Sequence, residues 1–318
     1  MKTNTFFRRA AALLLGIFIW PSVASAAPTT VFATGFEVAE AYNPQFEIWG
    51  QNDWTGFGSA GNGLLERFPG PGQQGYIGIF GPTNTSDTSH SIWRPIGFDP
   101  LTNGKPIVTF TVDFEIVDST SPSGRDDFRW AIYNTAARRL FSVDFDNSTT
   151  GICYLLEGDT QFRQTSFTFS RNTIYTLGIR MDFSANRWSA MLDSTTVITN
   201  QPITTAGSRL DLGDIDAVWA FLNGSAGDNF MAFDNYRITA EADIPLPPSL
   251  NLAGMIANGQ PLLNLVGEND RTYVIEATSD FVNWTPIKTN SPTDGQFQFL
   301  DIAGTNSNRR FYRVKAFP

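Results

Sequence analysis

The sequence predicts an all-β protein, and three observations lead to this fold class. Apolar and polar residues alternate with a period of two along many short segments. The spacing of an amphipathic helix is nearly absent. Turn-forming residues such as those of Pro69–Gly72 and Ser121–Gly124 separate the alternating segments. A dozen or more short strands in the roughly 215 residues from Ala27 to Glu241 indicate a two-sheet antiparallel sandwich.

The clearest predicted strand is Ile107–Ile116. Its apolar side chains occupy the even-numbered positions, whereas Thr109, Asp113 and Glu115 occupy the other face. The same pattern predicts strands within Phe141–Phe145 and Leu177–Phe183. Further strands are expected in Gln74–Phe80, Phe128–Tyr133, Gln164–Phe169, Arg187–Leu192, Val218–Leu222 and Phe230–Ile238.

The N-terminus has the pattern of an export signal. Basic residues precede an apolar run from Ala10 to Trp20, which is shorter than the roughly 20 residues of a membrane-spanning helix. Ala24-Ser25-Ala26 then supplies a cleavage motif. We therefore expect a signal peptide at 1–26 and a secreted, cell-surface or periplasmic location. No other apolar stretch approaches spanning length, so no membrane span is expected after cleavage.

Charge and proline content predict two domains. The chain has 22 basic and 31 acidic residues, and removal of Lys2, Arg8 and Arg9 with the signal leaves a net charge of −12. Six basic and six acidic residues follow Leu250, so the acidic excess belongs to the preceding part. A proline-rich linker at 242–249 would separate domains at 27–241 and 250–318. Nucleic acid is not expected as a partner of so acidic a protein.

The first predicted domain resembles the concanavalin A-like (laminin G-like) jelly rolls. The run Tyr175–Asp193 is similar to their paired hairpin strands. Phe36-Glu37 and Ala232–Ile238 are similar to the first and last strands of bacterial members of that group. The resemblance implies a jelly-roll sandwich, a fold that carries lectins as well as glucanases and lyases, so the fold alone does not decide the function.

The second predicted domain resembles a C-terminal β-module of exported proteins from Verrucomicrobia-like bacteria. Arg271–Thr285 and Arg309–Val314 carry this resemblance. We expect about five strands in a small immunoglobulin- or fibronectin-like sandwich, with a hairpin turn at Thr293-Asp294-Gly295. The resemblance implies an accessory, sorting or surface-contact role.

Asp113 and Glu115 are the candidate acids if the protein cleaves polysaccharides. They lie two positions apart on one face of a strand, about 6.6 Å from each other, as in the E-x-D-x-x-E strand of the glucanases. Here the order of the acids is reversed, and Asp118 falls at the end of the predicted strand. The alternative interpretation is that these charges are simply solvated.

Polar residues on the non-core faces of other predicted strands could form a ligand groove with this pair. Arg129, Asp144 and Arg180 are the main candidates, and Tyr133 and Asp146 occupy similar positions. Such a groove would bind a glycan or hold a general acid and base. Alternation also places ordinary solvated charges at such positions.

Tryptophan rings can stack on the apolar faces of sugars, and their sequence context separates two groups. Trp49, Trp54 and Trp93 lie in Gly-, Asn- and Ser-rich surroundings and are the stacking candidates. The tryptophans in apolar settings are expected in the core: Trp130, Trp188 and Trp219.

Histidine and cysteine chemistry is limited because the chain has one residue of each type. His90 is expected in an exposed loop, and Cys153 as a small buried hydrophobe. Calcium is the one cofactor expected, held by Glu37 and Asp234 where the first and last strands meet. Asp211, Asp214 and Asp216 are expected to form a solvated turn.

The sequence thus predicts a secreted carbohydrate-binding or cell-surface interaction protein that is not an enzyme. Its partner would be a glycan or a cell-surface polysaccharide. The alternative is a glycoside hydrolase or lyase that uses Asp113 and Glu115.

Overall fold

The structure is a computed structural model that describes residues 27–222, 226–243, 248–256, 259–268, 271–306 and 309–317. The predicted signal peptide and its cleavage site after Ala26 lie outside the described residues. Among the residues described, no helix is long and apolar enough to cross a membrane.

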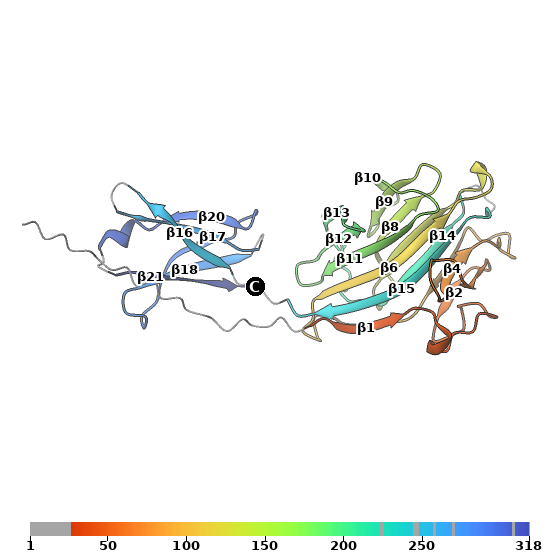
Figure 1. Cartoon of the computed structure of the whole chain (residues 1–318), viewed down its shortest axis with the longest axis horizontal. Helices are drawn as coiled ribbons and strands as arrows, with labels where there is room; N and C mark the ends of the chain where they lie inside the picture. Colours follow the sequence, from red (N-terminus) through yellow and green to blue (C-terminus); the bar gives the residue numbers. More distant parts are fainter. Residues whose placement is uncertain are drawn as a thin grey trace, which may run out of the picture.

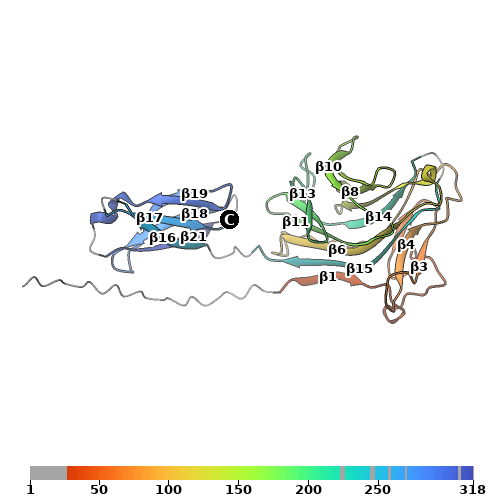
Figure 2. The ribbon, with the colours of Figure 1, turned by 45° about the horizontal axis from the view of Figure 1, so that its top comes forward.

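Two large antiparallel sheets form a sandwich between residues 29 and 241 (Figures 1 and 2). Sheet A contains, in spatial order, β13 (Thr195–Gln201), β12 (Arg187–Leu192), β11 (Ile174–Asp182), β6 (Ile107–Val117), β15 (Phe230–Glu241), β4 (Gln74–Gly78) and β3 (Asn62–Leu65). Its eighth strand, β1 (Thr29–Thr34), also pairs with β15. Sheet B contains β10 (Arg163–Thr168), β9 (Gly151–Leu156), β8 (Arg139–Asp146), β7 (Asp127–Tyr133), β14 (Asp214–Ala220), β5 (Ser89–Trp93) and β2 (Thr55–Phe57).

The predicted all-β sandwich is therefore confirmed, and the predicted strands of the first domain overlap β4, β6, β7, β8, β10, β11, β12, β14 and β15. In β6, the even-numbered residues Phe110, Val112 and Phe114 are fully buried between the sheets. Each such side chain contributes roughly 1.5–3 kcal/mol by leaving water. The first and last strands of the sandwich pair, with Thr34 opposite Tyr236. Phe36 and Glu37, expected in the first strand, instead follow β1 and lead into the 3-10 turn η1 (Val38–Glu40).

One continuous core joins sheets A and B and is rich in aromatic rings. Trp130, Trp188 and Trp219 are buried in it, which confirms their assignment. Trp188 stacks on Phe141 with ring centroids 4.0 Å apart, so the two sheets are packed ring against ring across the core.

Two smaller antiparallel sheets follow β15. One contains β16 (Ser249–Met255), β17 (Pro261–Val266) and β20 (Gln296–Leu300), and the other β19 (Thr285–Asn290), β18 (Thr272–Thr278) and β21 (Phe311–Phe317). A separate core lies between them, centred on Leu265, Tyr273 and Ile275. The part of the chain described after β15 thus has six strands rather than about five. The turn at Thr293–Gly295 joins strands of different sheets instead of forming a hairpin.

Helical structure among the described residues is confined to short 3-10 turns, namely η1 (Val38–Glu40), η2 (Pro122–Gly124) and η3 (Ile302–Asn306). The first of these carries the chain away from the β1 edge. Glu40 closes it by accepting hydrogen bonds from the Thr34 hydroxyl at 2.7 Å and the Gly35 amide at 2.9 Å.

Candidate functional site

A pocket of about 380 Å³ lies along β3, the last strand on one side of sheet A. Its walls come from the loop at 44–47, from residues 59–64, from β4 and from residues 80–83. A second pocket of about 260 Å³ adjoins it and shares Pro44 as a lining residue. We call these two pockets together the edge site. It combines apolar rings, carboxylates and amides, the mixture typical of small-ligand sites.

Three aromatic rings line the larger pocket. Phe46 and Phe80 are each 63% exposed, which is unusual for side chains of this size and apolarity. Tyr76 projects from β4 over β3, where a Cβ at position 63 would lie 2.9 Å from its ring. Only glycine at position 63 allows this close approach, so the local sequence positions the Tyr76 ring in the pocket wall.

Glu47 and Asn62 supply polar groups beside these rings. The Asn62 amide nitrogen lies 3.5 Å from Glu47 Oε2, and its oxygen accepts a hydrogen bond from the Trp49 amide at 3.1 Å. Burial raises the pKa of Tyr76, and the negative charge of Glu47 raises it further. The Tyr76 hydroxyl is therefore a neutral hydrogen-bonding group at physiological pH.

The smaller pocket contributes Glu37, Glu66 and Gln73. Glu37 leans over Gly72, where a Cβ would meet its Oε1 at 2.5 Å. The Oε1 atom of Gln73 is buried and has no hydrogen-bond partner in the described part of the chain. An unsatisfied buried acceptor is costly, and it belongs to a residue that lines this pocket.

The three predicted stacking tryptophans have different environments. Trp49 is 38% exposed and lies next to the edge site through its bond to Asn62, with its ring packed on Gly56. Trp54 is only 2% exposed and donates to the Tyr42 hydroxyl at 2.8 Å. The prediction for Trp54 is therefore wrong, because this Gly- and Asn-rich segment folds its indole into the core. Trp93 is half-buried at the end of β5.

The predicted groove of charged residues is divided between opposite faces of the sandwich. Arg129 and Asp144 lie side by side on the outer face of sheet B and form an ion pair at 2.9 Å. Arg180 pairs in register with Thr109 and Ser189 in sheet A, so it is exposed on the other side of the molecule. One groove containing all three residues is therefore excluded.

Asp113 and Glu115 are also in sheet A, and both are already engaged. Arg67 holds both carboxylate oxygens of Glu115, at 2.6 and 2.8 Å. Asp113 accepts hydrogen bonds from Thr176 and Asn235. A carboxylate held by a bidentate arginine is a poor general acid or base, so this geometry does not favour the catalytic role, which stays a prediction from the sequence.

A second carboxyl pair lies on the outer face of sheet B. Asp214 and Asp216 belong to β14 and project from the outer face of sheet B, so the expected solvated turn is wrong. Burial raises the pKa of Asp214 to about 6 and that of Asp216 to about 9, and the two carboxyls share a hydrogen bond. The register that pairs Ala217 with Ile92 brings Trp93 next to Asp216. The i, i+2 spacing of two aspartates within an apolar run was the available signal.

His90 and Cys153 differ in how they match expectation. His90 is fully buried in β5 rather than exposed in a loop, and burial lowers its pKa to about 4. Its Nε2 lies 3.3 Å from the Asn62 amide nitrogen. Cys153 is buried as predicted, and burial raises the pKa of its thiol to about 12, so it is not a reactive thiolate.

Glu37 and Asp234 do approach one another at the junction of β1 and β15. A Cβ on Gly35 would lie 3.6 Å from Asp234 Oδ1 and 3.8 Å from Glu37 Cγ. Burial raises the pKa of Asp234, and the charge of Glu37 adds to this. Calcium takes six to eight oxygens, and no group of three or more metal-ligating side chains occurs among the described residues. The two carboxylates therefore fit a calcium ion only if backbone or water oxygens complete the shell.

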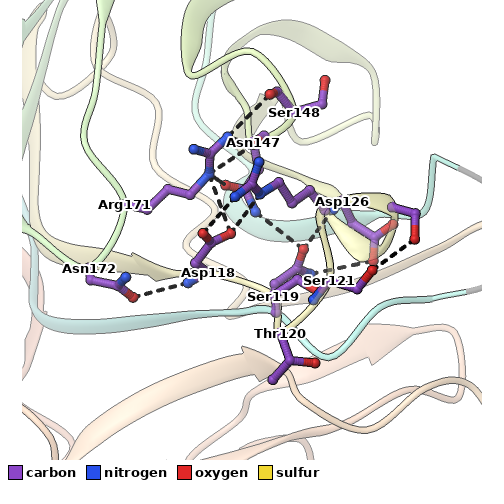
Figure 3. A network of polar contacts seen from close by, with 12 residues as sticks. Asp118, Ser119, Thr120, Ser121, Asp126, Asn147, Ser148, Arg171 and Asn172 are labelled. Atoms are coloured by element: carbon purple, nitrogen blue, oxygen red, sulfur yellow. Dashed lines mark hydrogen bonds and ion pairs between the residues drawn. The ribbon is translucent and has the colours of Figure 1, made fainter.

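A polar network ties the loops together at one end of the sandwich (Figure 3). Asp118 accepts two hydrogen bonds from Arg125, both at 2.8 Å, and its amide donates to Asn172. Arg171 donates to Asn147 and lies 3.5 Å from Asp118. Two guanidinium groups thus share the Asp118 carboxylate, and the network links loops that are far apart in sequence.

Comparisons with known proteins show no family. No family model matches the chain, and no curated protein matches it. Solved structures similar in shape include a sialidase (7% identity, TM-score 0.44), of which the chain covers 18% while 66% of this chain is aligned. Others are the carbohydrate-binding module CBM66 from Bacillus subtilis (14% identity, TM-score 0.35, 60% of this chain and 97% of that one) and a lectin from Bauhinia forficata in complex with GalNAc (14%, 0.41, 69% and 100%).

The chain thus spans about a fifth of the sialidase it resembles. These similarities are weak in both sequence and shape, and no function is transferred from them. The fold defines an all-β protein built from antiparallel sandwiches. Its resemblance to concanavalin A-like domains and to the Verrucomicrobia-like module stays a prediction from the sequence.

Proposed function

We propose that this protein is exported and binds a glycan at the edge site without cleaving it. The observation that carries this proposal is the pocket in which Phe46, Tyr76 and Phe80 accompany Glu47 and Asn62. Sugar rings present apolar C–H faces that pack on aromatic rings, and their hydroxyl groups form hydrogen bonds with carboxylates and amides. The N-terminal signal pattern supports export.

The first test is a glycan array followed by calorimetric titration of the bound glycans. Phe46→Ala and Phe80→Ala are each expected to weaken binding roughly 5- to 30-fold, which is the effect of losing one or two kcal/mol of ring contact. Both side chains are largely exposed, so their removal should leave the melting temperature nearly unchanged.

Phe57→Ala is the matched control. Phe57 is 61% exposed, almost as much as the two pocket phenylalanines, but it belongs to β2 in sheet B. Its removal should leave glycan affinity unchanged. Absence of any bound glycan, or an equal loss of affinity in all three variants, would contradict the proposal.

A further inference from the structure

The charged groups that line the edge site are all carboxylates. Glu47 lines the larger pocket, and Glu37 and Glu66 line the smaller one. Glu47 and Glu66 are exposed, and Glu37 is partly exposed. None of the described residues that line either pocket is Lys, Arg or His. A ligand therefore meets negative charge and lone pairs here.

Gln73 adds an acceptor that is independent of the glutamates. Its residue is 6% exposed, and its side-chain nitrogen donates to the Phe36 carbonyl at 3.4 Å. This bond orients the amide so that Oε1 is the unsatisfied atom. Because a buried acceptor without a partner is destabilising, a donor on the ligand would be stabilising at this position.

The basic residue nearest in sequence to this lining is already neutralised. Arg67 follows Glu66, but its guanidinium group is held by both oxygens of Glu115 and lies over the Phe230 ring, 5.4 Å from the centroid. The chain as a whole carries a net charge of −9. Both the local and the overall charge therefore repel polyanionic polysaccharides.

We propose that the edge site selects sugar units that carry a protonated amino group. This inference rests on the proposed glycan-binding function and names the class of glycan. An ammonium group has three donors and no acceptor, so it complements Glu47 in the larger pocket, and Gln73 offers a further acceptor in the smaller one. It is also attracted to the faces of aromatic rings such as Tyr76. A neutral sugar would use the rings but leave the carboxylates without a counter-charge.

The test compares glucosamine oligosaccharides with N-acetylglucosamine oligosaccharides of equal length. Calorimetric titrations would use the protein without its signal peptide, at about pH 6, where such amines are largely protonated and glutamates are ionised. EDTA in the buffer would exclude bound metal ions as the source of any effect. The amino oligosaccharide should bind at least tenfold more tightly, and its advantage should shrink as salt rises from about 50 to 500 mM.

Glu47→Gln keeps the shape of the side chain and removes its charge. It should abolish most of the preference for the amine while leaving the affinity for the acetylated oligosaccharide within about twofold. Glu241→Gln is the matched control, because Glu241 lies at the C-terminal end of β15, whereas the N-terminal end of β15 pairs with β4. This control should retain the full preference.

The outcomes separate the two proposals. Equal binding of both oligosaccharides, or tighter binding of the acetylated one, would overturn selection for the amine while glycan binding stands. Selection for the amine is likewise overturned if Glu47→Gln and Glu241→Gln behave alike. If no glycan of any kind binds, both proposals fail.

Discussion

Asp216 is buried on the outer face of sheet B, 6% exposed, and next to a second carboxyl group. Burial is the main reason that its pKa rises to about 9, and the negative charge of Asp214 adds to it. Among the described residues, no ion pair is formed by either aspartate. A proton rather than a basic side chain therefore keeps this pair stable.

This arrangement predicts a stability that declines as the pH rises from about 4 to about 9. Between about pH 4, where a free aspartate titrates, and about pH 9, the folded protein binds more protons than the unfolded chain. The stabilisation is complete below about pH 4 and is lost as the pH rises through about 9. Asp216→Asn has no carboxyl proton to lose at this position. The free energy of unfolding of this variant, relative to that of the native protein, should therefore rise with pH by up to about 1.4 kcal/mol per pH unit.

Urea unfolding at pH 5, 7 and 9 would measure this difference. Asp53→Asn is the control, because the Asp53 side chain is 79% exposed. Parallel stability curves for the native protein and Asp216→Asn would show that the buried pair does not hold its proton.

At the scale of the elements, the predicted metal site depends on the junction of β1 and β15. β15 has a register irregularity between Asp234 and Arg237, and Asn235 has a φ of 51°, in the left-handed region. Asp234 lies at this bulge and close to Glu37, although the two residues are 197 positions apart in the chain. Bulges of this kind cannot be read from alternation, because they interrupt it.

We predict a weak calcium site at this junction. With only two carboxylates as ligands, the dissociation constant should be about 1 mM, as in weakly binding extracellular modules. Calcium at about 10 mM would then stabilise the protein by about 1.4 kcal/mol, visible as a higher melting temperature than with a chelator. Asp234→Asn should abolish this shift, and Asp294→Asn, in the turn between β19 and β20, should retain it. An identical melting temperature in calcium and in chelator would contradict the predicted calcium site.

At the scale of the whole molecule, the strands form two groups with separate cores. The larger core joins sheets A and B, and the smaller lies around Leu265 and Tyr273. An ion pair at 2.7 Å connects Asp243, after β15, with Arg271, before β18. Because the two cores share no residue, burial in one does not depend on burial in the other.

We therefore predict two independent unfolding units, with a boundary inside 242–249. Calorimetry of the protein without its signal peptide should show two transitions. A fragment ending at Asp243 should keep the first transition within a few degrees and should keep glycan binding. If the protein instead shows a single transition, and the fragment shows none, the two cores fold as a single unit.

Much of the fold was predictable because the relevant signals are local. Alternation in Ile107–Ile116 identified a strand and its buried face, and the apolar settings of Trp130 and Trp188 identified core residues. These signals depend only on the two-residue repeat of a strand and on the cost of exposing apolar surface.

The candidate site was far less predictable. Alternation shows which residues share a face of one strand, but not the sheet to which that strand belongs. Arg129 and Arg180 therefore had the same pattern but lie on opposite sides of the sandwich. A Gly- and Asn-rich context likewise could not show that Trp54 folds inward and bonds to Tyr42.

The all-β class, most strand positions and the acidic character of the protein can be read from the residues alone. The ion pair of Arg67 with Glu115, the joint burial of Asp214 and Asp216, and the pocket where the loop at 44–47 meets β3 and β4 appear only in the folded chain. The difference lies in the sequence separation of the contacts involved. Strand formation depends on neighbouring residues, whereas a binding site depends on contacts between segments that are distant in sequence and meet only in the folded chain.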